Sequence, residues 1–407
     1  MRTLPAADAR AGLARVSGAL DRLERWITNH GPAGSDPYDG LNSPWARAAG
    51  LFGRWGRIAF LQLVRRSPRL LRPLALIPHS INPKGLALLA QAYLDLHLSR
   101  GDTGYLERAR EHLEWLEHHA STAVGTGWGY PFDWSARAFF VPRNTPSIVV
   151  TATVGKVFLE ASQRMQEPRL LDVARNAAAF VGSGLNRSES EHGMCFSYTP
   201  LDQSRIYNAS LLGASLLARV AAQGDPSGDL LELARRATRF VLARQNDDGS
   251  WCYGDAPFHR WIDGHHTGFI LRDLGEIRAA TGWPELDSPL DGGMKFYRER
   301  LLAPDGRPLF RVDRPWPADI HACAEAVLVL SDPNLRGAST DPLGRALEVV
   351  DWTVQNLQRP DGAFGYLKHP GRTDWTPHLR WGQAWMLHAL ARLEGQLSAT
   401  PATGGER

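Results

Sequence analysis

The sequence predicts an all-α fold, an (α/α)6 barrel in which six helical hairpins close into a single toroid. Three observations support this prediction. A turn of Gly and aromatic residues recurs along the chain, segments of helical period lie between the turns, and no convincing pair of strands competes with them. A chain of 407 residues would ordinarily divide into two or three domains. The repeat instead predicts one closed unit.

The recurring turn gives the number of hairpins. In its last four copies, the glycines Gly193, Gly249, Gly306 and Gly362 are separated by 56, 57 and 56 residues. The two earlier gaps are longer, which leaves room for an insertion around Pro68 to Pro83. Six copies imply six hairpins, and they are Tyr38–Asn42, Gly127–Tyr130, Gly193–Tyr198, Asp248–Tyr253, Asp305–Phe310 and Asp361–Tyr366.

Segments between the turns have the apolar spacing of helices. Leu230 to Arg244 places apolar residues on one face and Arg on the other. Ala322 to Leu330 and Ala384 to Leu393 are nearly all apolar, as expected of inner helices that are buried on both sides. We therefore expect an N-terminal outer helix at 1–30, the toroid domain at 31–395 and a disordered C-terminal tail at 396–407.

Two turns carry the pattern Gln-x-x-x-Gly-x-aromatic, from Gln245 to Trp251 and from Gln358 to Phe364. In closed helical toroids such as the squalene and terpenoid cyclases, this pattern ties the end of an outer helix to the next turn. A Gln side chain can bond exposed backbone groups at the helix terminus while the aromatic ring packs over it. The pattern therefore indicates a structural role.

Composition narrows the function classes. The net charge is +3, from 46 Lys and Arg against 43 Asp and Glu, and no dense basic run predicts nucleic-acid binding. The run from Arg65 to Arg72 is short and interrupted by Pro68, which indicates local packing or contact with an anion. No apolar stretch approaches the length of a membrane span, so we expect no integral membrane segment. Three Cys and a start unlike a signal peptide predict a cytoplasmic location, and no oligomeric state is indicated.

Every outer-to-inner turn of such a barrel opens on the same end, so the starts of the inner helices converge on one mouth. After the fourth turn, Asp263 stands at an expected N-cap and His266 begins an otherwise apolar helix. An imidazole there can exchange protons near neutral pH. One hairpin later, Asp319 and His321 stand at the equivalent place. These four residues are the predicted catalytic group, with the alternative that they are structural and the Asp side chains only cap helices.

Polar and aromatic residues around the same turns predict the lining of a saccharide site. Arg380 would hold a carboxylate or phosphate through its planar guanidinium, or else cap neighbouring helix ends, and Trp381 would stack on a sugar face. The predicted substrate-binding residues are Asp39, Asn42, Tyr130, Asp133, Trp134, Tyr198, Asn208, Trp251, Tyr253, Arg380, Trp381 and Gln383.

A zinc site is an alternative for the same region. The turn around Cys252 is similar to a zinc-ligand turn of the lanthionine cyclases, and Cys323 with His321 could complete a set of three ligands. That family places Cys beside His, whereas Ala322 separates them here. We therefore expect no metal and no cofactor.

The motifs together resemble the bacterial polysaccharide-biosynthesis proteins of the VpsJ type. They cover nearly the whole chain, from about residue 30 to 395, and they are Asp36–Pro44, Arg66–Pro68, Asn82–Leu86, Gly129–Trp134, Phe196–Pro200, His266–Phe269, Asp319–Ala322 and Arg380–Trp385. The resemblance implies a substrate from surface-polysaccharide metabolism. The fold also resembles unsaturated glucuronyl hydrolases, where Asp residues do acid/base chemistry, and N-acylglucosamine 2-epimerases, where a His pair does.

The leading hypothesis is a carbohydrate-active enzyme that uses acid/base chemistry on a sugar or oligosaccharide. Two bases on opposite faces of a carbon would suit epimerisation, and two carboxylates flanking a glycosidic oxygen would suit hydrolysis. A non-catalytic saccharide-binding or scaffold protein of a polysaccharide assembly complex is the second hypothesis. A terpenoid cyclase-like enzyme is the third, and it lacks an Asp-x-Asp-Asp motif.

Overall fold

Twelve helices build the barrel in the computed structural model, which describes residues 6–66, 68–122, 125–135, 140–335 and 341–399. The six inner helices are α5 (Pro83–Arg100), α7 (Ile148–Met165), α9 (Tyr207–Ala221), α11 (Gly264–Thr281), α13 (Ile320–Ser331) and α15 (Ala384–Ser398). The six outer helices are α1 (Ala6–His30), α6 (Gly104–His118), α8 (Pro168–Ser183), α10 (Asp229–Leu242), α12 (Asp287–Arg300) and α14 (Pro342–Leu357). The predicted (α/α)6 barrel is confirmed.

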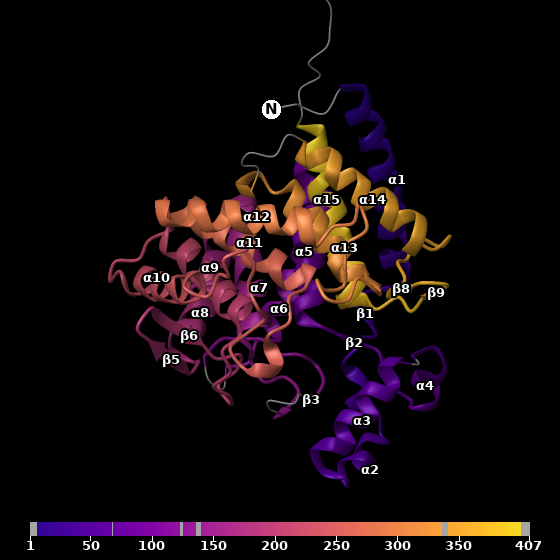
Figure 1. Cartoon of the computed structure of the whole chain (residues 1–407), viewed down its shortest axis with the longest axis horizontal. Coiled ribbons are helices and arrows are strands. Elements are labelled where there is room, and N and C mark those ends of the chain that lie inside the picture. Colours follow the sequence, from indigo (N-terminus) through magenta and orange to yellow (C-terminus); the bar gives the residue numbers. More distant parts are fainter. Residues whose placement is uncertain (1–5, 67, 123–124, 136–139, 336–340, 400–407) are drawn as a thin grey trace, which may run out of the picture.

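Each inner helix packs against the next one, and α15 returns to α5, which closes the ring. The first helix supplies the sixth outer position because α1 packs on α15 and α14, and Figure 1 shows indigo α1 beside yellow α15. All twelve residues of α13 are buried, as expected of an inner helix. Helix α15 continues to Ser398 with Leu397 buried, three residues past the expected boundary of the tail, and 400–407 lie outside the described residues.

Short strands and single helical turns occupy the connections. The strands form antiparallel pairs, β1 (Ala33–Gly34) with β2 (Ser80–Ile81), β3 (Trp134–Ser135) with β4 (Phe140–Val141) and β5 (Arg187–Ser190) with β6 (Gly193–Phe196), and one three-stranded sheet of β7 (Ala318–Asp319), β8 (Leu367–His369) and β9 (Arg372–Asp374). The short helices are η1 (Asp39–Asn42), η2 (Pro257–His259), η3 (Pro284–Leu286), η4 (Pro333–Leu335) and the π-helical turn η5 (Leu379–Gln383). Among the described residues, no helix is long and apolar enough to cross a bilayer.

An insertion between α1 and α5 forms a separate lobe. It contains η1, α2 (Ala46–Gly50), α3 (Gly53–Arg66) and α4 (Pro68–Leu74), and it projects below the barrel in Figure 1. The pairing of β1 with β2 joins its two ends. The insertion therefore begins well before Pro68, where the sequence placed it, because the longer segment is itself helical.

The regular turns of the last four repeats press their glycines against backbone of the barrel. All four have positive φ, between 85° and 126°, a region that side chains other than Gly rarely adopt. A Cβ at any of them would lie within 2.6 Å of a carbonyl oxygen of another outer helix. That carbonyl belongs to Arg236 of α10 for Gly193, Gly292 of α12 for Gly249, Glu348 of α14 for Gly306 and Arg22 of α1 for Gly362.

Gln245 and Gln358 complete the same junction. The Nε2 of Gln245 donates to the carbonyls of Gly249 and Pro289, at 3.0 and 2.9 Å. The Nε2 of Gln358 donates to those of Gly362 and Ala19, at 3.1 and 2.9 Å. Each Gln therefore joins its own turn to the following outer helix, and the structural role predicted for the pattern is confirmed.

The close approach at the turns predicts a difference between two Gly→Ala variants. Gly371 has a φ of 78° but open space around it, whereas a Cβ at Gly362 would lie 2.2 Å from the carbonyl of Arg22. Gly371→Ala should lower the free energy of unfolding by about 1 kcal/mol through backbone strain alone. Gly362→Ala should lower it by about 3 kcal/mol or more, because strain and overlap add. Denaturant unfolding measures both, and equal losses would contradict the packing described.

Candidate functional site

A cavity of about 560 Å³ opens where the inner helices begin. Its wall combines the starts of α11 and α13, the turns of several hairpins, and Arg65 from helix α3 of the insertion lobe. Nine predicted site residues line it, namely Asp263, His266, Asp319, Tyr130, Trp134, Tyr198, Tyr253, Arg380 and Trp381. The convergence expected from the direction of the inner helices is therefore present in the structure.

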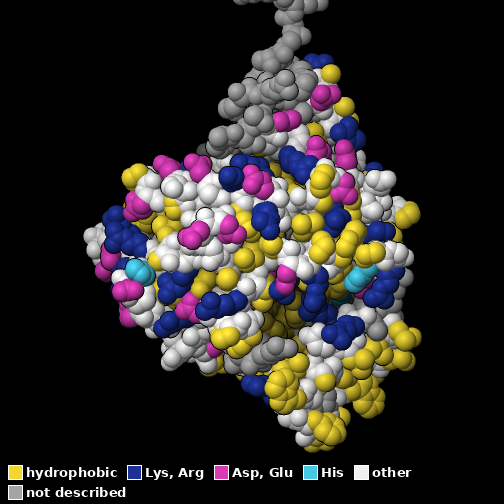
Figure 2. All heavy atoms as spheres, in the orientation of Figure 1, with side chains coloured by type: hydrophobic (Ala, Val, Ile, Leu, Met, Phe, Trp, Pro, Cys, Tyr) yellow, Lys and Arg dark blue, Asp and Glu magenta, His cyan; other side chains and the backbone are white. Residues whose placement is uncertain are grey.

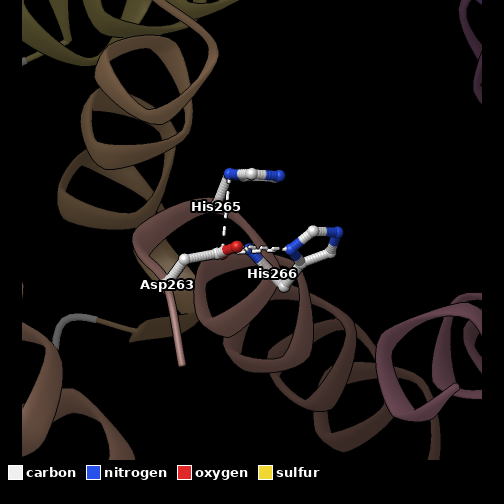
Figure 3. A group of neighbouring side chains, drawn as sticks. All are labelled: Asp263, His265 and His266. Atoms are coloured by element: carbon white, nitrogen blue, oxygen red, sulfur yellow. Dashed lines mark hydrogen bonds and ion pairs between the residues drawn. The ribbon is translucent and has the colours of Figure 1, made fainter. Parts of the chain in front are cut away.

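Asp263 caps helix α11 and also orients His266. Its carboxylate accepts a hydrogen bond from the backbone N–H of His266 at 2.8 Å and lies 2.8 Å from the Nδ1 of the same residue. Figure 3 shows the carboxylate beside both rings, with dashed lines to His265 and to His266. With Nδ1–H donating to the carboxylate, neutral His266 has an unprotonated Nε2, and no described residue forms a hydrogen bond with that atom. His266 is therefore oriented as a base at the cavity wall.

Asp319 caps helix α13 in the same way but in a different electrostatic setting. Its Oδ1 accepts hydrogen bonds from the backbone N–H of His321 at 2.9 Å and from the indole Nε1 of Trp381 at 2.8 Å. Burial raises the pKa of the carboxyl to about 6, against the opposing effect of these two hydrogen bonds. Burial also disfavours ionisation of Asp263, but its contacts with His265 and His266 outweigh this and lower the pKa to about 2. At mildly acidic pH, the carboxyl of Asp263 is therefore ionised while that of Asp319 is largely protonated.

His321 lies beneath the cavity wall and not in it. The side chain is 2% exposed, and neither ring nitrogen has a hydrogen-bond partner among the described residues. Its ring centroid is 4.9 Å from that of His265, 4.5 Å from Trp381 and 4.8 Å from Trp385. Burial lowers its pKa well below the ordinary value, so the ring is neutral. The structure therefore does not bring His321 to the cavity as the partner of His266.

His265 takes the position that the sequence assigned to His321. It lines the cavity, its ring centroid is 4.0 Å from that of His266, and its Nδ1 is 3.5 Å from Asp263. Burial lowers the pKa of His265 to about 3, with the charge of Asp263 opposing that shift. The spacing Asp263-x-His265 is the same as Asp319-x-His321. In the repeat, the residue equivalent to His321 is therefore His265 and not His266. That spacing was the signal that could have identified His265.

Aromatic rings form most of the remaining wall. Tyr253 and Trp261 stack with centroids 4.4 Å apart, and both present edges to the ring of His266. Trp134 lies 5.3 Å from Tyr198 on another part of the wall. Trp261 follows the fourth turn but was not predicted, as was the case for Arg65, Ile206, Phe258, His259, Phe310 and Arg311. Tyr38 and Phe132, which lie in or next to the first and second predicted turns, also line the cavity. Apolar ring faces beside acid/base groups are suited to a ligand with both CH and OH groups, such as a sugar.

Arg380 reaches the cavity, but its charge is already paired. Its Nη2 donates to Asp36 at 2.8 Å and its Nε donates to the other oxygen of the same carboxylate. The guanidinium also lies 5.1 Å from the ring centroids of Tyr130 and Trp381. Both partners of this ion pair are buried, so the predicted role of Arg380 in holding a ligand anion is taken by Asp36.

Six other predicted binding residues lie away from the mouth cavity. Asp39 pairs with Arg72, Asn42 donates to the carbonyl of Pro131, and Asp133 accepts from the backbone of Arg143. The remaining three also lie outside the cavity wall. Trp251 is buried with its Nε1 donating to Val241, Gln383 bonds the backbone of Phe364, and Asn208 lines a second cavity. None of the six lines the mouth cavity.

That second cavity, about 510 Å³, lies along the barrel lumen. Lys84, Phe269 and Trp385 line it, and the ammonium of Lys84 lies over both aromatic rings, at 5.3 and 5.2 Å. His321 contacts Phe269 and Trp385 on the side of this cavity. On its other side it contacts the mouth residues His265 and Trp381. The ring of His321 therefore lies between the two cavities. Burial lowers the pKa of Lys84 to about 7.

One group among the described residues has the arrangement of potential metal ligands. Asp263, His265 and His266 each offer one ligand atom, and these atoms lie within 4.8 Å of one another. The set that the sequence offered for zinc does not come together in this way. Cys323 is fully buried with a raised pKa, and the thiol of Cys252 donates to the carbonyl of Arg260.

No family model matches the chain, and no curated protein matches it in sequence. Solved structures do match in fold. Cellobiose 2-epimerase from Bacillus thermoamylovorans has a TM-score of 0.61 at 11% identity, covering 77% of this chain and 88% of that one. A D-mannose isomerase has a TM-score of 0.59 at 12% identity, covering 78% and 87%.

An α-1,6-mannanase of Salegentibacter has a TM-score of 0.53 at 15% identity, covering 79% of this chain and 90% of that one. That structure holds α-1,6-mannotriose, and the variant was made inactive by replacing two consecutive aspartates with asparagine. At these identities, the three comparisons establish that the chain shares the (α/α)6 fold of sugar-converting enzymes.

The opposite pKa shifts of the two capping carboxyls predict opposite effects of pH on stability. Asp319 binds its proton more tightly in the folded chain, so its stabilisation is lost as the pH rises from about 4 to about 6. Asn retains the accepting oxygen. The free energy of unfolding of Asp319→Asn, relative to the wild type, should therefore increase across that range by up to about 3 kcal/mol.

Asp263→Asn is the matched comparison, since Asp263 also caps an inner helix. Its pKa is lowered, so its stabilisation is present above about pH 4 and is lost as the pH falls towards 2. The deficit of this variant relative to the wild type should shrink on acidification. Denaturant unfolding at several pH values measures both, and parallel pH profiles for the two variants would contradict the assignment.

Proposed function

We propose that the protein is a carbohydrate-active enzyme that transfers protons at a sugar carbon next to a carbonyl, as a sugar epimerase or isomerase does. The observation that carries the proposal is the pairing of His266 Nδ1 with Asp263, at 2.8 Å, in a residue that lines the cavity and whose Nε2 forms no hydrogen bond with a described residue. An imidazole held in this way is an oriented base of the kind used in general acid/base catalysis. The fold shared with cellobiose 2-epimerase and D-mannose isomerase supports the same chemistry.

The proposed step needs no oxidant or cofactor. His266 Nε2 takes the proton from the carbon beside the carbonyl of the open-chain sugar, and the electron pair of the C–H bond forms an enediol as the carbonyl oxygen gains a proton. Asp319, with a pKa near 6, is suited to give and recover that second proton. Return of this proton from His266 to the neighbouring carbon gives the isomer. Its return from His266 to the opposite face of the first carbon, after the enediol has turned over in the cavity, gives the epimer.

Glycoside hydrolysis is the second candidate, favoured by two carboxyls with pKa values of about 2 and about 6 in one cavity. It ranks lower because the Asp263 carboxylate is occupied by the helix cap and by His266. The consecutive aspartates that matter in the Salegentibacter mannanase also have no equivalent in the mouth. The one such pair in this sequence, Asp247-Asp248, is exposed in the turn after α10 and does not line the cavity.

We also propose that the substrate belongs to surface-polysaccharide metabolism and that the protein is cytoplasmic. The resemblance of the motifs to polysaccharide-biosynthesis proteins supports the first, and three free cysteines support the second. A non-catalytic saccharide-binding or scaffold protein would need the aromatic wall but not an oriented imidazole. A terpenoid cyclase is disfavoured because the ionisable groups Asp263, Asp319 and His266 all line the cavity.

Solvent exchange tests the reaction type across a panel of sugars. The protein is incubated in D2O with reducing mono- and disaccharides, uronic acids and amino sugars, and deuterium on carbon is measured by NMR. The wild type should incorporate deuterium into one class of sugar. Asp263→Asn and His266→Gln should slow the exchange by about 100-fold or more, because the oriented base is lost.

Asp248→Asn is the control and should keep the wild-type rate. New reducing ends from a polysaccharide, without deuterium on carbon, would replace the proposal with hydrolysis. Saccharide binding that survives both site variants, with no exchange and no product, would indicate a binding protein.

A further inference from the structure

The insertion lobe has an unusual concentration of apolar side chains on its surface. Eight of the thirteen exposed large hydrophobic residues found in the described chain lie between residues 45 and 76. They form what we term the apolar face, which consists of Trp45, Leu51, Phe52, Trp55, Leu63, Leu70, Leu74 and Leu76. Figure 2 shows hydrophobic side chains spread over the projecting lobe, in contrast to the mixed charges of the barrel. A surface of this kind on a folded chain usually marks a binding site.

Helix α3 has two distinct faces. Leu61, Val64 and Arg65 point inwards, where Leu61 and Val64 pack against Gly40 and Arg65 reaches the mouth cavity. Trp55 and Leu63, two helical turns apart, lie on the opposite side and are 62% and 56% exposed. The exposed apolar residues therefore follow the helix period and form a continuous side of α3, whose other side is already packed.

The lobe is held in a defined position. Arg72 forms a two-point ion pair with Asp39, at 2.6 and 2.7 Å, and both side chains are largely buried. The hydroxyl of Ser43 donates to the carbonyl of Ala75 at 2.6 Å. These contacts join both ends of the insertion beside β1 and β2. They hold the helices that carry the apolar face in a fixed position.

The charge of the lobe favours a partner that carries negative charge. Residues 45–76, the part of the lobe that carries the apolar face, contain seven Arg and no Asp or Glu. Two of these Arg point elsewhere, since Arg65 lines the mouth cavity and Arg72 is paired with Asp39. Outside this segment, the chain has 39 Lys and Arg against 43 Asp and Glu. Arg54 and Arg66 are exposed beside the apolar residues, and the guanidinium of Arg54 lies 5.1 Å from the ring of Trp55. Arg, Trp, Phe and Leu on short amphipathic helices are the composition of segments that lie in the interface of an anionic bilayer.

We propose that the apolar face docks the protein on a membrane surface that carries anionic lipid. Trp and Phe side chains enter the boundary between headgroups and acyl chains, and the Arg side chains contact the lipid phosphates. With 14 residues, α3 lies along the surface and does not span it. A second copy of the chain is a poorer partner, because a symmetric contact would bring two acid-free, Arg-rich faces together.

Vesicle flotation tests this proposal with the full chain. The wild type should float with vesicles of phosphatidylcholine and phosphatidylglycerol, bind much less to phosphatidylcholine alone, and dissociate as salt is added. Phe52→Ser/Trp55→Ser/Leu63→Ser should reduce flotation to background. Arg54→Gln/Arg66→Gln should weaken binding to the anionic vesicles about 30-fold while leaving the weak binding to phosphatidylcholine unchanged.

Leu98→Ser/Leu201→Ser/Leu231→Ser is the matched control, because these exposed residues lie outside the lobe and should not affect flotation. Circular dichroism and thermal melting confirm that each variant is folded. Wild type that does not float, or floats equally with both vesicle types, would overturn the proposal. So would a dimer in analytical ultracentrifugation, in place of flotation, that the Phe52/Trp55/Leu63 variant abolishes. Vesicle binding does not depend on the reaction at the mouth, so its failure would leave the proposed function untouched.

Discussion

Six inner helices that begin at one end of the barrel impose the main physical constraint on this molecule. Each outer helix carries the chain back, so every inner helix presents unpaired N–H groups and the positive end of its dipole at the mouth. In four of the six described inner helices a side chain satisfies these groups, from Asn82, Ser147, Asp263 and Asp319. Where the cap is Asp, the same requirement places an acid at the cavity. The glycines of the last four turns allow those turns to pack closely on the neighbouring outer helices.

Capping and turn chemistry are local, which explains why the barrel, Asp263 and Asp319 could be predicted from the sequence. The sequence does not determine as directly which way a side chain points around its helix. Neighbouring side chains differ in direction by about 100°, so an error of one residue moves a side chain from the cavity to another surface. That is why His321 lies beneath the wall, and why Asn208 lines the lumen cavity. The pairing of Arg380 with Asp36 joins residues 344 positions apart, and no spacing in the sequence indicates it.

The aromatic side chains around Asp319 determine how the two caps differ. His321, Trp381 and Trp385 exclude water on the side of Asp319, so burial dominates there and raises its pKa to about 6. Asp263 is equally buried but is in contact with two imidazoles and the helix backbone, so its charge is stabilised and its pKa is about 2. One structural motif, an Asp cap on an inner helix, thus yields an acid in one place and an orienting anion in the other.

The insertion lobe connects this chemistry to the outer surface of the molecule. Within helix α3, Leu63 and Arg65 are two residues apart and point to opposite sides, the first to solvent and the second to the cavity. Arg65 donates to the hydroxyl of Tyr366 and lies over Tyr38, so α3 is a wall of the mouth. A bilayer bound to the apolar face would therefore lie about one helix diameter from the cavity wall. One side of α3 would then contact the bilayer, while its other side forms part of the wall of the mouth.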